Sequence, residues 1–185
     1  CEDACTRGKV EEALSIDAIK RFIAEQDLNA KTRHIPKVVI PASIHMDHFD
    51  EKIAIIGAGP AGLTAAFYIA ETGYRPTVIE KSEHPGGMLR YGIPSYKLEK
   101  DLLDAEIDVA KAMGVEIKTG IEVGKDVTIQ QLREQGYKAF YIAIGCAAGR
   151  LPGLENENAE GVMTAIDYLH DANCGNAPFA GKVVV

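Results

Sequence analysis

The hydrophobic pattern of the chain changes near residue 50. Between residues 27 and 50 no helical period holds, and two prolines and three histidines interrupt the sequence, so we expect a linker with a short strand at 37–40. From residue 52 onward, short apolar runs of strand length alternate with longer segments whose apolar residues recur every three or four positions. This alternation predicts an α/β fold with a parallel sheet.

The apolar runs predict strands that are buried on both faces, as the strands of parallel sheets are. The expected strands are 52–56, 77–80, 115–118, 139–144 and 182–185.

The periodic segments predict five helices. Ser15 is the expected N-cap of the first, whose apolar face is Ile16, Ile19, Phe22 and Ile23. In the third, one apolar face is expected from Leu98, Leu102, Ala105, Val109 and Met113. The expected helices are 15–26, 63–72, 97–113, 128–135 and 164–170.

A glycine-rich turn stands between the strand at 52–56 and the helix that follows it. Gly57, Gly59 and Gly62 form the pattern GxGxxG in this position. The first glycine permits a tight turn, the second lets the backbone approach a pyrophosphate, and the third lets the helix pack closely on the strand. The turn therefore predicts a dinucleotide site of the Rossmann type; an ordinary glycine turn is the alternative.

Glu80 ends the second strand, 23 residues after Gly57. A carboxylate at this point accepts hydrogen bonds from the adenosine ribose and repels a 2′-phosphate, which indicates FAD or NAD rather than NADP. The pair Gly86 and Gly87 then stands where an NAD domain would continue into its next helix, and this favours FAD. Residues 88–90 are expected to line the flavin and its phosphates.

Composition and charge narrow the class of protein. With 185 residues, 46% of them hydrophobic and 25% charged, the chain is expected to form one globular domain with a small appendage. The net charge of −7 disfavours nucleic acid as a partner. We find neither an apolar run long enough to cross a membrane nor a signal peptide, so a cytoplasmic protein is expected.

The four cysteines are too sparse for a disulfide scaffold. Cys1 and Cys5 form the one close pair, which indicates metal binding or redox chemistry; a disulfide or two free thiols are the alternatives. Cys146 and Cys174 form no CxxC motif and are expected to be structural thiols.

The runs GAGPAGL at 57–63 and PGGMLRYGIP at 85–94 resemble the small (β) subunit of NADPH-dependent glutamate synthase. They are also similar to its relatives, the N-terminal part of dihydropyrimidine dehydrogenase and the large subunit of electron-bifurcating NADH-dependent ferredoxin:NADP oxidoreductase. The resemblance covers nearly the whole chain. It implies a helical iron–sulfur domain, an FAD domain and an NADPH domain.

The resemblance also implies boundaries and site residues. Residues 1–35 would be the C-terminal part of the iron–sulfur domain, 36–50 a linker, 51–180 an incomplete FAD-binding domain and 181–185 the first strand of a missing NAD(P)H-binding domain. Combined with the motifs, it gives the candidate cofactor-binding residues Gly57, Ala58, Gly59, Pro60, Ala61, Gly62, Glu80, Lys81, Gly86, Gly87, Met88, Leu89, Arg90, Ile93, Val123, Ala143, Ile144 and Gly145.

Cys1 and Cys5 would be ligands of a [4Fe-4S] cluster under the same resemblance. Such a cluster takes four thiolates, so the ligand set in this sequence is incomplete. Some relatives supply a ligand from the position of Lys20, but a protonated ammonium group cannot ligate iron. No second glycine fingerprint follows strand 182–185, so the chain is expected to lack its own NADPH site.

The function that this resemblance implies is an FAD-dependent electron-transfer unit that passes electrons between NADPH or NADH, FAD and iron–sulfur clusters. Its partner would be a larger redox subunit, either similar to the glutamate synthase large subunit or linked to ferredoxin, and this fragment alone would be inactive. The alternative is a non-catalytic flavin-binding or docking fragment of a larger redox complex, for example a bifurcating transhydrogenase or hydrogenase. An NAD-dependent dehydrogenase would need a substrate domain after residue 150, and no segment there has that form.

Overall fold

The computed structural model describes residues 2–28, 33–40 and 48–176. The chain divides into two compact units, Cys1–Ile35 and Pro36–Val185. In the first unit a 3₁₀ helix, η1 (Thr6–Lys9), precedes α1 (Ile16–Asp27), which begins after Ser15 as expected. The apolar residues of α1 that were expected to share one face are exposed.

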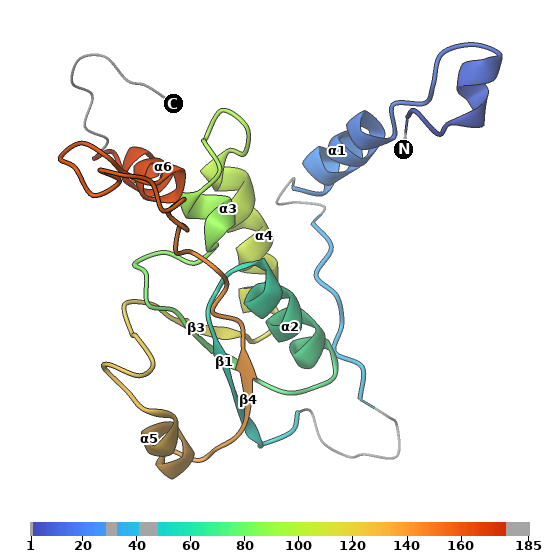
Figure 1. Cartoon of the computed structure of the whole chain (residues 1–185). Helices are drawn as coiled ribbons and strands as arrows, with labels where there is room; N and C mark the ends of the chain where they lie inside the picture. The colour runs from blue at the N-terminus through green and yellow to red at the C-terminus, as the bar shows by residue number, and fades with distance from the viewer. Residues whose placement is uncertain (1, 29–32, 41–47, 177–185) are drawn as a thin grey trace. The chain divides into compact units, whose positions relative to one another are not determined.

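In the part of the second unit that the structure describes, four strands form a parallel sheet (Figure 1). The strands are β1 (Lys52–Ile56), β2 (Thr77–Ile79), β3 (Glu116–Lys118) and β4 (Tyr137–Ile142), and their order is β3-β2-β1-β4. Every pair of neighbours is parallel. The chain order reverses between β1 and β4, and a Rossmann-like sheet binds its ligand outside the carboxyl ends of the strands at such a point. The predicted α/β fold is confirmed.

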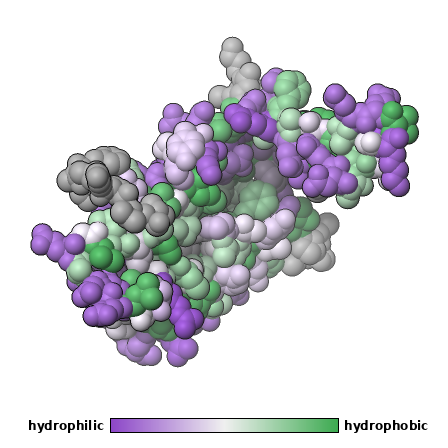
Figure 2. Space-filling view, turned by 45° about the horizontal axis from the view of Figure 1, so that its top comes forward, coloured by the Kyte–Doolittle hydropathy of each residue, from purple (hydrophilic) through white to green (hydrophobic). Residues whose placement is uncertain are grey.

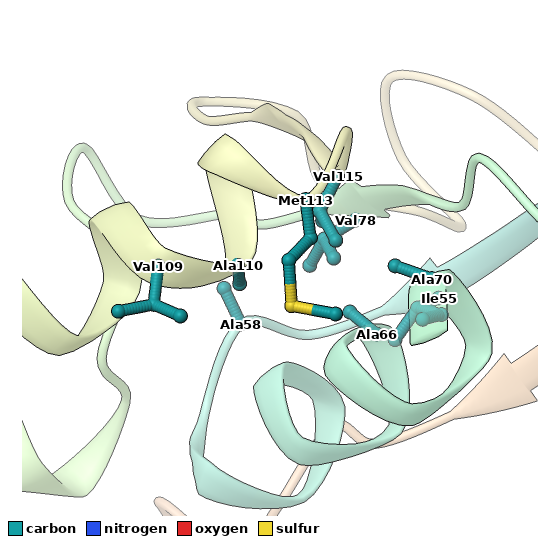
Figure 3. Close-up of a cluster of buried hydrophobic side chains, with 9 residues drawn as sticks. All are labelled: Ile55, Ala58, Ala66, Ala70, Val78, Val109, Ala110, Met113 and Val115. Carbon is teal, nitrogen blue, oxygen red and sulfur yellow. The ribbon is translucent and has the colours of Figure 1, made fainter. Parts of the chain in front are cut away.

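Helices α2 (Pro60–Glu71) and α4 (Lys100–Ala112) contribute to one core cluster with β1 and β2. The buried positions of α2 are Gly62, Ala66 and Ala70, which lie on one face because they are four residues apart. These small residues allow the helix to lie close to the sheet. Met113, at the C-terminal end of α4, extends its thioether toward Ala66 and fills the space between the two helices (Figure 3).

A smaller core cluster joins β1 and β2 to α5 (Ile129–Glu134). A capping box between Thr128 and Gln131 fixes the start of α5. The single turn α3 (Met88–Tyr91) and the helix α6 (Ala165–Asn173) complete the unit, and Thr164 caps α6 by accepting a hydrogen bond from the backbone N–H of Asp167.

Several predicted elements need correction. The last described strand is Tyr137–Ile142 rather than 139–144; it is largely exposed, and it lies at one edge of the sheet that the described strands form. Helix α4 begins at Lys100 rather than at 97, and its buried residues are Leu103, Ile107, Val109 and Ala110, so the predicted apolar stripe was partly wrong. The turn α3 was not predicted. The expected strand 182–185 lies outside the described residues.

Residues 33–40 contain no strand, which corrects the prediction for 37–40. The described residues of segment 36–50 instead hydrogen-bond to the C-terminal end of α2. The backbone N–H of Val39 donates to the Glu71 carbonyl (2.7 Å) and that of Phe49 to the Gly73 carbonyl (2.8 Å). The Phe49 ring also stacks on Tyr74, with ring centroids 4.7 Å apart.

The surface is mixed in character. Figure 2 shows hydrophobic residues (green) in patches between hydrophilic ones (purple) on the face turned to the viewer. Among the described residues, no helix has both the length and the apolar character required to span a bilayer.

Candidate functional site

The glycines of the first turn have different structural roles. Gly57 has a φ of +105°, and a Cβ placed there would lie 2.3 Å from the Ala143 carbonyl oxygen. A Cβ on Gly62 would lie 1.9 Å from the Gly57 carbonyl oxygen. Both positions therefore require glycine for packing. A Cβ on Gly59 would meet only the Gly87 Cα within 4 Å, at 3.9 Å, so its neighbourhood is open.

The N-terminal end of α2 offers unpaired backbone amides. Gly59 is the N-cap and has no side chain to accept from the first turn. Pro60 has no N–H, and the amides of the following two residues have no intrahelical carbonyl to bind. These amides and the positive end of the helix dipole favour an anionic group at this point.

Glu80 follows β2 and joins two loops. Its carboxylate is buried, with 7% of the residue exposed. Oε2 accepts a hydrogen bond from the backbone N–H of Ala58 (2.7 Å), and Oε1 accepts one from that of Ser82 (2.8 Å). A carboxylate oxygen has a second lone pair, so both oxygens can still accept from the hydroxyls of a ligand.

The second glycine pair brings its loop against the first. The backbone N–H of Gly86 donates to the Ala58 carbonyl (2.8 Å). Gly87 has a φ of +54°, and a Cβ there would lie 2.7 Å from the Gly59 Cα. The pair was expected to let the backbone approach a ligand; in the structure it also lets one loop cross the other, and this crossing places α3 beside the N-terminus of α2.

Two adjoining cavities form a cleft beyond the carboxyl ends of β1, β2 and β4. Their volumes are about 450 and 500 Å³. The first is bordered by the N-terminal end of α2, α3 and α6, and the second extends past Glu80 to Val123. The residues that line both are Gly57, Glu80, Lys81, Ile144, Gly145, Cys146 and Ala147.

The cleft brings together twelve of the candidate cofactor-binding residues. Those that line it are Gly57, Gly59, Pro60, Ala61, Glu80, Lys81, Gly87, Met88, Val123, Ala143, Ile144 and Gly145. The others lie behind this lining, within the two glycine loops, the first turn of α2 or the segment after Gly87. These are Ala58, Gly62, Gly86, Leu89, Arg90 and Ile93.

Arg90 is placed differently from the expectation that it faces the flavin and its phosphates. Its Nε donates to the Pro85 carbonyl (2.6 Å), and its guanidinium pairs with Asp104 of α4. The side chain is mostly buried, with 12% exposed. Asp104 thereby ties the second glycine loop to the helix.

The cleft also contains residues that sequence reasoning missed. Tyr91 of α3 and His170 of α6 stack with ring centroids 5.0 Å apart and an interplanar angle of 20°. The sequence predicted a helix at 164–170 but carried no information on where it lies relative to the cleft. The missed lining residues are Ser82, Tyr91, Cys146, Ala147, Ile166, Asp167 and His170 in the first cavity and Ile56, Ile79, Ile121, Glu122, Cys146, Ala147 and Ala148 in the second.

The cysteines are the candidate metal ligands of the chain. Cys1 lies outside the described residues, while Cys5, Cys146 and Cys174 are free thiols. The pKa of the Cys5 thiol lies below its ordinary value of 9.0, because the backbone N–H groups of Leu14 and then Arg7 donate to the sulfur. Within the described residues, no group of three or more metal-ligating side chains converges on one point.

The lowered pKa of Cys5 predicts how the rate of its reaction with iodoacetamide depends on pH. Hydrogen bonds to the sulfur favour the thiolate, which is the reactive form. Alkylation of Cys5 should therefore reach half of its maximum rate below pH 9.0, as followed by fragment-ion mass spectrometry of the N-terminal peptide. A half-maximum at or above that pH would show that the backbone does not stabilise the thiolate.

These features define a dinucleotide-binding α/β domain: a glycine turn and helix N-terminus after β1, an acidic residue after β2, and a cleft over the strand ends. The chain belongs to the pyridine nucleotide-disulphide oxidoreductase family, whose profile matches residues 51–185.

Individual relatives agree with this assignment. The chain is 38% identical to NADP(+)-dependent formate dehydrogenase subunit beta of Moorella thermoacetica, over 100% of this chain and 28% of that protein. It is 34% identical to the glutamate synthase (NADPH) small chain of Escherichia coli K12, over 91% of this chain and 34% of that protein. The resemblance to the glutamate synthase small subunit is thereby confirmed at the level of the family.

Among solved structures, the chain is similar to FprA from Mycobacterium tuberculosis, with a TM-score of 0.58 and 25% identity over 66% of this chain and 29% of that one. The chain spans from about a quarter to about two fifths of the length of the curated relatives that it matches.

Proposed function

We propose that this chain is the FAD-binding part of an NAD(P)H-dependent flavin oxidoreductase that passes electrons between NAD(P)H, FAD and iron–sulfur clusters. One observation carries the proposal: a helix N-terminus with free backbone amides, the buried Glu80 carboxylate and an extended cleft lie together at the carboxyl ends of the strands of one sheet. The family and the named oxidoreductase relatives support the redox role.

The shape of the cleft suits an extended dinucleotide. The two cavities share Gly57 and Glu80; one of them reaches Val123, and the other reaches Met88 and Tyr91. The diphosphate would lie at the first turn of α2, the adenosine ribose at Glu80 and the adenine toward Val123. The flavin half would extend toward α3, where the lining is a thioether and a phenol.

When FAD is bound, its ring supplies hydride acceptance and single-electron release. The chain positions the cofactor: the α2 amides hold the diphosphate, Glu80 holds the ribose, and the 143–147 segment limits access of water to the cleft. Arg90 is engaged by Pro85 and Asp104 and acts on the shape of the loop. The proposed role requires no general acid or base from the described residues.

The wider assembly follows from the same family assignment. We propose that residues 1–35 belong to an iron–sulfur domain with Cys1 and Cys5 among its ligands, that 36–50 connect it to the flavin domain of residues 51–180, and that 181–185 begin the NAD(P)H domain. The formate dehydrogenase and glutamate synthase relatives are subunits or chains by name. A larger redox subunit is accordingly the proposed partner.

Competition between nucleotides tests the proposed orientation. ADP-ribose should displace FAD from the chain, whereas ADP-ribose with a 2′-phosphate should compete about tenfold or more weakly, because the Glu80 carboxylate repels the added charge. Flavin fluorescence reports the displacement. Equal competition by the two ligands would place the ribose away from Glu80, and failure of the chain to bind FAD would overturn the proposed function.

A further inference from the structure

The turn α3 depends on distant side chains for its conformation. It has four residues, and a single helical turn is not stable alone because nucleation costs more than one hydrogen bond returns. Two of its residues, Met88 and Tyr91, line the cleft. Whatever fixes α3 therefore also fixes this part of the site.

The carbonyl of Leu89 lacks its usual helical partner. In a continuing α-helix the N–H of Ile93 would donate to it, but this N–H donates to the Met88 carbonyl at 3.1 Å. The next residue, Pro94, has no N–H. The end of α3 thus leaves an acceptor that only a group from elsewhere can satisfy.

Lys100, the first residue of α4, supplies that group. Its Nζ donates to the Leu89 carbonyl at 3.0 Å and to the Ile93 carbonyl at 2.5 Å. A cation is the favourable cap at the C-terminal end of a helical turn, where carbonyl oxygens accumulate. The side chain therefore fixes both the end of α3 and the segment that leaves it.

The position of the Lys100 ammonium is not explained by an ion pair with a described acidic side chain. Asp104, the acidic residue one turn further along α4, pairs with Arg90, and none of the ion pairs among the described residues includes Lys100. The pKa of Lys100 is lowered, first by burial and then by the charge of Arg90. The ammonium is thus held in an unfavourable environment, where its main described partners are the two carbonyls.

We propose that Lys100 is a positioning residue of the cleft, whose ammonium caps α3 and so holds Met88 and Tyr91 against the flavin half of the bound cofactor. This inference rests on the proposed function. The inference adds that Lys100, which does not line the cleft, controls the binding of the flavin half of FAD but not of the ADP half. Lys100 should affect the flavin half of FAD and leave the ADP half unaffected.

The test compares FAD and ADP on the full 185-residue chain. K100M removes the donors, K100R keeps a cationic donor, and K111M removes a positive charge from the exposed side of the same helix. K100M should raise the Kd for FAD about tenfold, the effect of losing hydrogen bonds to a charged group. The Kd for ADP should change less than about twofold, K100R should recover most of the FAD affinity, and K111M should resemble the wild type.

Flavin fluorescence gives the Kd for FAD, and displacement of a fluorescent ADP analogue gives the Kd for ADP. An FAD affinity in K100M equal to that of the wild type overturns the inference while the proposed function stands. Equal losses for FAD and ADP, or no recovery in K100R, also overturn it, because they indicate a general loss of structure or a steric effect. Absence of FAD binding by the wild-type chain overturns the proposed function and the inference together.

Discussion

Replacing Gly59 with alanine is expected to leave the fold intact and to weaken FAD binding by about two orders of magnitude, equivalent to ~3 kcal/mol. The added Cβ would meet only the Gly87 Cα, at 3.9 Å, which is an ordinary van der Waals distance. Gly59 has a φ of −76°, which alanine adopts without strain. The methyl group would instead occupy space at the cleft where the backbone must approach the diphosphate.

The neighbouring glycines provide the matched contrast. Alanine at Gly57 or Gly62 would place a Cβ 2.3 or 1.9 Å from a backbone oxygen, so both variants are expected to lose stability as well as binding. Thermal unfolding and an FAD titration on the three variants separate the effects. An unchanged FAD affinity in G59A would show that the N-terminus of α2 does not contact FAD. A large fall in the melting temperature of G59A would show that Gly59 is required for the stability of the fold rather than for binding.

The sequence was sufficient to predict that Gly57, Gly59 and Glu80 meet in one cleft. They follow the ends of two adjacent strands, and spacing along the chain determines the local backbone geometry there. The strand β1 was predictable because it is a continuous apolar run that ends in glycine. The helix α2 was predictable because Pro60 marks its start and Gly73 its end.

The remaining parts of the site depend on contacts between distant segments. His170 reaches the cleft because α6 packs on α3, and Arg90 turns away from it because Asp104 lies opposite on α4. Neither contact leaves a periodic signal in the sequence. The exposure of β4 was also unpredictable, because an apolar run looks the same whether its strand lies at the centre or at the edge of a sheet.

Glutamine at Glu80 is expected to weaken both the fold and nucleotide binding. The carboxylate accepts from two backbone N–H groups, of Ala58 and Ser82, whereas a glutamine amide has one oxygen and one NH₂ group. One of the two N–H groups would then face another donor. A buried donor without a partner costs about 1–3 kcal/mol, so the melting temperature of E80Q should fall by roughly 2–12 °C in a chain of this size.

The effect on binding follows from the same geometry, because Glu80 fixes the loop that holds Ala58 and, in the proposed site, would also accept from the ribose. E80Q should weaken the binding of ADP-ribose about tenfold. It should also reduce the discrimination against ADP-ribose with a 2′-phosphate, since the repelling charge is gone. E83Q is the matched control, because the Glu83 side chain is 88% exposed in the same loop, and it should leave both properties unchanged. Retained discrimination in E80Q would mean that another group excludes the phosphate, while unchanged stability would show that water satisfies the Ala58 and Ser82 amides in place of the carboxylate.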